Sequence, residues 1–236
     1  MKPGPFPIAL DDGEITATVY PAARAASTTT TLLLAHGAGA GQGHPYMIGT
    51  AERLRARGVS VVTFDFPYME RGGKLPDKNG VLEACFRAVF TAVRRETDGA
   101  LFAGGKSMGG RISSQVAAKG DLDPAGLVFL GYPLHPPGKS RSSGVDRAAH
   151  LPKVRAPMLF VQGTRDVFGT PSDLAPLVPK LAEGSRLFAV EGGDHSHVVL
   201  KRGGVAQDAV YAGIADAIAQ WMGERERERG RERERD

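Results

Sequence analysis

The stretch that decides the fold is LFAGGKSMGGR, residues 101–111. An apolar run, a glycine-flanked serine and a helix-compatible segment follow one another, which predicts a strand, a tight turn at Ser107 and a helix. A serine at the apex of such a turn takes strained backbone angles, and Gly105 and Gly109 leave room where side chains would collide. This is the G-x-S-x-G pattern of a nucleophilic serine. Glycine is abundant here, with 31 residues, so the pattern needs support from the rest of the chain.

The length and composition fit one α/β domain, expected to span 1–222. The chain has 236 residues, of which 42% are hydrophobic, enough for a full core. Its longest apolar runs, such as Thr31–Ala35 and Met158–Val161, are far below the roughly 20 residues that a membrane-spanning helix needs. Prolines near the N-terminus stand where a signal peptide would be apolar, and the single cysteine, Cys85, excludes an internal disulfide. We therefore expect a cytoplasmic protein with no membrane contact.

The charge distribution does not favour a nucleic-acid partner. The net charge is +4 and the isoelectric point is near 9.3, but arginines are scattered and no aromatic-basic cluster is present. Residues 223–236 alternate glutamate and arginine, so their charges largely cancel. We expect this segment to be a solvated, flexible tail or a fraying extension of the last helix.

Strand and helix patterns alternate from residue 31 onward, which implies an α/β fold with a mostly parallel central sheet and helices on both faces. The segment 65–74 reads as a loop. The Pro-, Gly- and Ser-rich stretch 135–151 is too short for a large lid domain. An edge strand is expected at 15–20 and buried strands at 31–35, 59–64, 126–130, 158–162 and 186–190, besides the one before Ser107. Helices are expected at about 45–57, 81–95, 173–182 and 204–222, besides the one after Ser107.

Two polar partners for Ser107 follow predicted strands. Asp166 comes after the strand at 158–162, and His195 after the strand at 186–190. The carboxyl ends of parallel strands meet at one edge of a sheet, so the three side chains are expected to lie together. They have the residue types and chain order of a catalytic triad: serine attacks, histidine takes its proton and aspartate orients the histidine. Alternatives stay open, with Asp173 or Asp65 as the acid and His197 as the base.

Two backbone amides are expected to form an oxyanion hole. Met108 follows the serine at the start of its helix, and Ala38 lies in the glycine-rich loop after the strand at 31–35. His36, in that loop, is expected to be a structural residue. No His, Asp and Glu spacing suggests a metal site, and the glycines at 37, 39 and 41 fit neither a dinucleotide fingerprint nor a P-loop. We expect no cofactor.

Several motifs together resemble one branch of the α/β-hydrolases. They are HGAGAG at 36–41, DFPYME at 65–70, GGKSMGGR at 104–111, GYPLH at 131–135 and DHS at 194–196. The chain is similar to dienelactone-hydrolase-like bacterial proteins whose eukaryotic relatives include testis-expressed proteins and a subunit of the NSL histone-acetyltransferase complex. The resemblance covers about 31–222 and implies an α/β-hydrolase fold, a small or absent lid and no cofactor. True dienelactone hydrolases use a cysteine nucleophile, so the serine argues against that specific reaction.

Three residues are proposed to contact substrate: Tyr68 in the strand-end loop 65–74, Lys106 beside the nucleophile, and His44. Lys106 is otherwise expected to anchor a neighbouring loop to a carboxylate. The leading hypothesis is a serine hydrolase that cleaves a small ester or thioester. The alternatives are a small peptidase and a hydrolase-like binding module without turnover.

Overall fold

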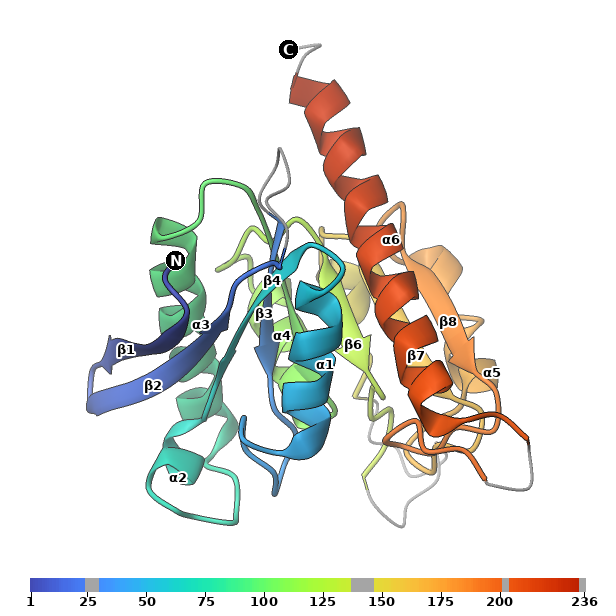
Figure 1. The fold of residues 1–236 in the computed structure, drawn as a ribbon, viewed down its shortest axis with the longest axis horizontal. Helices are drawn as coiled ribbons and strands as arrows, with labels where there is room; N and C mark the ends of the chain where they lie inside the picture. Colours follow the sequence, from blue (N-terminus) through green and yellow to red (C-terminus); the bar gives the residue numbers. More distant parts are fainter. Residues whose placement is uncertain (24–29, 137–146, 201–203, 234–236) are drawn as a thin grey trace.

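The computed structural model describes residues 1–23, 30–136, 147–200 and 204–233. Within these residues eight strands form one sheet in the order β1-β2-β4-β3-β5-β6-β7-β8 (Figure 1). The pairs from β4 to β8 are parallel, and β1 and β2 are antiparallel to their neighbours. The expected mostly parallel sheet is confirmed. The strands are β1 Gly4–Leu10, β2 Gly13–Tyr20, β3 Thr30–Ala35, β4 Val59–Phe64, β5 Ala100–Lys106, β6 Leu127–Leu130, β7 Met158–Gly163 and β8 Arg186–Val190.

Helices cover both faces of the sheet, because alternate residues of the central strands point to opposite sides. In β3, Leu33 packs into the core formed with α3 and α4, whereas Leu32 and Leu34 pack into the core formed with α1 and α6. Figure 1 shows these two helical layers on either side of the strands. The helices are α1 Pro45–Arg55, α2 Pro67–Glu70, α3 Asn79–Arg95, α4 Met108–Ala118, α5 Pro171–Leu174 and α6 Gln207–Arg233.

Two expectations near the N-terminal side are wrong. The segment 15–20 lies within β2 and is not an edge strand, because β1 pairs along its outer side, with Ile8 opposite Ile15. Pro5 and Pro7 argue against a strand at this position, because proline has no amide proton to donate. An edge strand such as β1 nevertheless tolerates proline. The segment 65–74 is not entirely a loop, since α2 forms within it.

The expected helix at 173–182 is also wrong. It is broken into the single turn α5 and a 3₁₀ turn at Val178–Lys180. Pro176 and Pro179 remove amide donors that a continuous helix would need. The stretch 135–151, expected to be too short for a large lid domain, lies in the connection between β6 and β7. Residues 137–146 of this stretch lie outside the described part of the chain.

The last helix continues beyond Met222, where the sequence analysis ended it. Glu226 accepts a hydrogen bond from the Thr30 hydroxyl at 2.5 Å, and Glu224 forms an ion pair of 2.6 Å with Arg186. Arg225 is only 7% exposed and pairs with Glu228 one turn later. The Arg225–Glu228 pair at helical spacing and the contacts to Thr30 and Arg186, together with the high helix propensity of Glu and Arg, explain why the alternating sequence extends the helix.

Helix α4 lies unusually close to the sheet at Gly109, and this closeness is testable. A Cβ atom there would stand 2.5 Å from the Ala35 carbonyl oxygen, so we expect Gly109→Ala to lower the free energy of unfolding by about 1–3 kcal/mol in urea denaturation. Gly213→Ala in α6 is the matched control, because no described atom other than the neighbouring backbone of α6 lies within 4 Å of its Cβ position, and alanine there should stabilise by up to about 1 kcal/mol. A Gly109→Ala protein as stable as wild type would contradict the close packing.

Candidate active site

The turn between β5 and α4 has the strained geometry expected from its sequence. Ser107 has φ of 49°, a value that residues with a side chain rarely adopt. The turn is possible because three residues near it are glycines. Cβ atoms at Gly105 and Gly109 would each stand 2.5 Å from the Ala35 carbonyl oxygen, and one at Gly104 would overlap the Val128 carbonyl. The serine hydroxyl is thereby fixed at the N-terminal end of α4.

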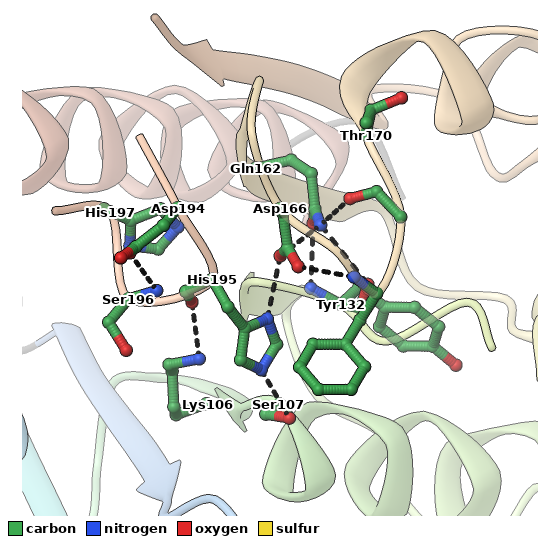
Figure 2. A network of polar contacts seen from close by, with 12 residues as sticks. Lys106, Ser107, Tyr132, Gln162, Asp166, Thr170, Asp194, His195, Ser196 and His197 are labelled. Carbon is green, nitrogen blue, oxygen red and sulfur yellow. Dashed lines mark hydrogen bonds and ion pairs between the residues drawn. The ribbon is translucent and has the colours of Figure 1, made fainter. Parts of the chain in front are cut away.

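Ser107, His195 and Asp166 form a continuous chain of polar contacts (Figure 2). His195 Nε2 lies 2.9 Å from Ser107 Oγ, and His195 Nδ1 lies 2.8 Å from Asp166 Oδ2. A carboxylate only accepts hydrogen bonds, so Nδ1 carries the proton and Nε2 is left to accept from the serine hydroxyl. The structure therefore brings together the three residues that the sequence analysis grouped.

Asp166 is buried at 2% exposure and held by donors that the sequence analysis did not identify. Its Oδ1 accepts from the Phe168 amide at 2.8 Å, and its Oδ2 accepts from Gln162 Nε2 at 2.8 Å. Gln162 is fully buried, and its Oε1 accepts from the Tyr132 amide at 2.8 Å (Figure 2). The position of Gln162 as a polar residue next to the end of the otherwise apolar strand β7 was the available sequence signal for this role.

The alternative acids and base lie elsewhere. Asp173 caps α5 through the Thr170 amide at 2.9 Å, and Asp65 accepts from the Gln42 amide at 2.7 Å. His197 is fully buried, with Nδ1 2.8 Å from the Tyr46 hydroxyl and Nε2 3.1 Å from the Val161 carbonyl. Burial, and then the neighbouring Lys106 charge, lower the pKa of His197 to about 4. It is therefore a neutral residue that supports the loop carrying His195.

Both residues whose amides are expected in the oxyanion hole line the same cavity as Ser107. Met108 is the first residue of α4, where the amide has no acceptor within its own helix. Ala38 and Gly37 also line the cavity, and a Cβ atom at Gly37 would stand 3.6 Å from Ser107 Cβ. His36, in the same loop, is buried: its Nδ1 lies 2.7 Å from the Gly37 carbonyl and its Nε2 accepts from the Phe66 amide at 3.0 Å. That arrangement fits a structural role.

The cavity in front of Ser107 has a volume of about 480 Å³ and includes two of the three residues expected to contact substrate. His44 and Lys106 line it, whereas Tyr68 does not: it is 2% exposed and packs edge-on against His36, with ring centroids 5.9 Å apart. The lining residues are Gly37, Ala38, Ala40, His44, Tyr46, Met47, Pro76, Asp77, Asn79, Leu82, Lys106, Ser107, Met108, Arg111, Pro133, Arg147, Phe168, His195 and Ser196.

Lys106 anchors the histidine loop through a backbone carbonyl and not through the carboxylate expected from the sequence. Its Nζ donates to the His195 carbonyl oxygen at 2.7 Å (Figure 2). Burial lowers the pKa of Lys106 to about 8, although the charges of Asp166 and Asp194 oppose this shift. The elbow and the histidine are thus connected on two sides, through Ser107 Oγ and through Lys106 Nζ.

In the described part of the chain, no group of three or more His, Cys, Asp or Glu side chains is arranged to hold a metal ion. None of the helices in the same residues combines the length and apolar character that crossing a membrane requires.

The lowered pKa of Lys106 predicts a pH-dependent stability difference. The unfolded lysine, with a pKa of about 10.5, binds a proton that the folded protein has already lost above about 8. The contribution of Lys106 to the free energy of unfolding therefore rises with pH between about 8 and 10.5. We expect the unfolding free energy of wild type minus that of Lys106→Met, measured in urea, to increase from pH 7.5 to 10, with the exposed Lys153→Met as control. A difference that stays flat over this range would contradict the burial of an ionisable amine.

The fold is shared with many solved structures. XC6422 from Xanthomonas campestris, described as an α/β serine hydrolase without lid, has a TM-score of 0.72 at 20% identity, covering 94% of this chain and 95% of that chain. Est1E from Butyrivibrio proteoclasticus has a TM-score of 0.70 at 12% identity, covering 93% and 99%. A dienelactone hydrolase from Anabaena variabilis has a TM-score of 0.70 at 16% identity, covering 95% and 99%.

At these identities the structural likeness shows the fold alone, but a match in sequence extends it. A family model described as an alpha/beta hydrolase domain matches residues 28–223, which include the elbow, its polar partners and every strand from β3 to β8. The chain belongs to the α/β-hydrolase family.

Proposed function

We propose that this protein is a serine hydrolase that cleaves small carboxylic esters or thioesters through an acyl-enzyme intermediate. The observation that carries the proposal is the hydrogen-bonded chain from Ser107 through His195 to the buried Asp166. Its geometry matches the requirement that a base lie within hydrogen-bond reach of the nucleophile and be oriented by a third group.

In the acylation step, Ser107 Oγ attacks the carbonyl carbon while its proton moves to His195 Nε2. A C–O bond forms, and the carbonyl electron pair moves onto oxygen, where the amides of Met108 and Ala38 donate hydrogen bonds. Asp166 stabilises the imidazolium. The oxyanion then collapses, the bond to the leaving group breaks, and His195 returns its proton to the departing alcohol or thiol.

Deacylation repeats the sequence with water. His195 takes a proton from water as the oxygen attacks the acyl carbon, and the proton then passes to Ser107 Oγ as the free acid leaves. The cavity of about 480 Å³ lies at the small end for a binding site, which favours short substrates.

The proposal also includes membership of the dienelactone-hydrolase-like branch, a small-molecule substrate and a cytoplasmic location. The motif GGKSMGGR supports the dienelactone-hydrolase-like branch, and Ser107 in place of cysteine favours simple esters.

Labelling with a fluorophosphonate probe tests the nucleophile. We expect one covalent adduct per chain on Ser107, found by intact mass and peptide mapping, because the oriented imidazole makes this hydroxyl a nucleophile. Ser107→Ala should not be labelled, and neither should wild type unfolded in urea. A folded protein that stays unlabelled while a reference serine hydrolase reacts would refute the proposal and favour a binding module without turnover.

The role of Asp166 is tested by a pair of isosteric variants. Asp166→Asn should lower kcat for a 4-nitrophenyl ester by about 10⁴-fold, because an amide favours the wrong histidine tautomer. Asp173→Asn, which weakens a helix cap worth about 1 kcal/mol, should leave kcat near wild type. If the two variants have similar kcat values, Asp166 is not the orienting acid.

A further inference from the structure

The cavity wall beside Ser107 carries two guanidinium groups, and neither forms an ion pair with a carboxylate among the residues that the structure describes. Arg111 lies one helical turn beyond the serine, with its amide donating to the Ser107 carbonyl at 3.1 Å. Both residues line the cavity. Within the described residues, the Arg111 side chain donates to two neutral amide oxygens, those of Gln115 at 3.1 Å and Asn79 at 3.3 Å.

Arg147 reaches the same cavity from the connection between β6 and β7. Its backbone is held in place, since its amide donates to the Leu134 carbonyl at 3.4 Å and its carbonyl accepts from the Tyr132 hydroxyl at 3.1 Å. Its guanidinium makes no hydrogen bond or ion pair with any residue that the structure describes. A fixed backbone with an uncommitted cationic end is the arrangement of a ligand-binding side chain.

The other charges around the cavity leave an excess of positive charge. Lys106 adds a third cation to the lining. The one acidic side chain among the lining residues, Asp77, forms an ion pair of 2.9 Å with Arg71. Burial lowers the pKa of Arg111, and both burial and the charge of Arg111 lower the pKa of Arg147. The two guanidinium groups therefore repel each other in the absence of an anion.

We propose that Arg111 and Arg147 bind an anionic group, so that the substrates of the proposed hydrolase are esters or thioesters that carry a carboxylate. The inference rests on the proposed function and specifies its substrate class. Guanidinium groups bind carboxylates through paired N–H donors, and an anion between them would relieve both their repulsion and the cost of burying unpaired charge.

Paired esters that differ only in charge test the subsite. On the acyl side, 4-nitrophenyl hydrogen adipate is compared with 4-nitrophenyl methyl adipate; on the alcohol side, 4-acetoxybenzoate is compared with its methyl ester. Spontaneous hydrolysis is subtracted. We expect kcat/KM for at least one anionic ester to exceed that of its neutral partner by about tenfold or more, the range for hydrogen bonds to charged groups. Arg147→Gln should abolish this preference, and 0.5 M salt should reduce it.

Arg155→Gln is the matched control, because it removes an equal charge from an exposed residue outside the cavity and should retain the preference. Arg111→Lys should weaken the preference without abolishing it, since the charge is kept and the planar fork is lost. Neutral esters hydrolysed as well as the anionic ones in both pairs would overturn the subsite and leave the serine hydrolase intact.

If the protein hydrolyses none of the four esters, ligand binding is measured instead. Calorimetry with Ser107→Ala and 4-acetoxybenzoate or adipate should show binding that is lost in Ser107→Ala/Arg147→Gln and kept in Ser107→Ala/Arg155→Gln. No measurable binding, or binding unaffected by Arg147→Gln, would overturn the subsite. Failure of the proposed hydrolase activity is detected separately, because Ser107 would then not be labelled by the fluorophosphonate probe.

Discussion

The structure depends on how closely three strands and one helix approach one another around Ser107. The backbone of β5 and the start of α4 press against the Ala35 carbonyl at the end of β3, and Gly104 presses against the Val128 carbonyl in β6. This steric constraint admits only glycine at these positions. At the apex of this close-packed turn, Ser107 has a positive φ of 49°. A strained residue keeps one conformation only because its neighbours over-determine it, and here they are the central strands of the sheet.

The partners of the serine are fixed by a different means, a buried polar network at the end of β7. Gln162 connects the Asp166 carboxylate to the backbone at Tyr132 and at Gly169, to whose carbonyl it donates at 2.6 Å. Asp166 and His195 lie on loops that begin at the ends of β7 and β8. A buried side chain donates a hydrogen bond to each residue, Gln162 to Asp166 and Lys106 to His195. Lys106 completes the network by connecting the elbow to the His195 carbonyl. These buried hydrogen bonds restrict the positions of the loop residues.

The sequence predicted those parts of the molecule that local chemistry specifies. Glycines flanking Ser107 and apolar runs followed by Asp166 or His195 were enough for the sheet, the elbow and the polar partners. It could not predict β1, because its prolines argue against a strand unless an edge position is known. Gln162 and Lys106 were missed or misassigned for another reason: Gln162 accepts from the Tyr132 amide and Lys106 donates to the His195 carbonyl, contacts between distant parts of the chain that exist only in the fold. Arg147 was missed because only the fold brings it to the cavity that Ser107 lines.

The cations around Ser107 have opposite effects on the two charges that the proposed mechanism creates. Lys106 and Arg111 line the same cavity as Ser107, so their positive charge would favour an oxyanion formed there, but the same charge would disfavour an imidazolium at His195. A carboxylate in contact with the imidazole offsets the second effect, and burial increases its influence by excluding water. Asp166, at 2% exposure and 2.8 Å from His195 Nδ1, meets that requirement. A cationic cavity and a deeply buried acid are therefore complementary parts of one site, since each charge that develops meets a fixed charge of opposite sign.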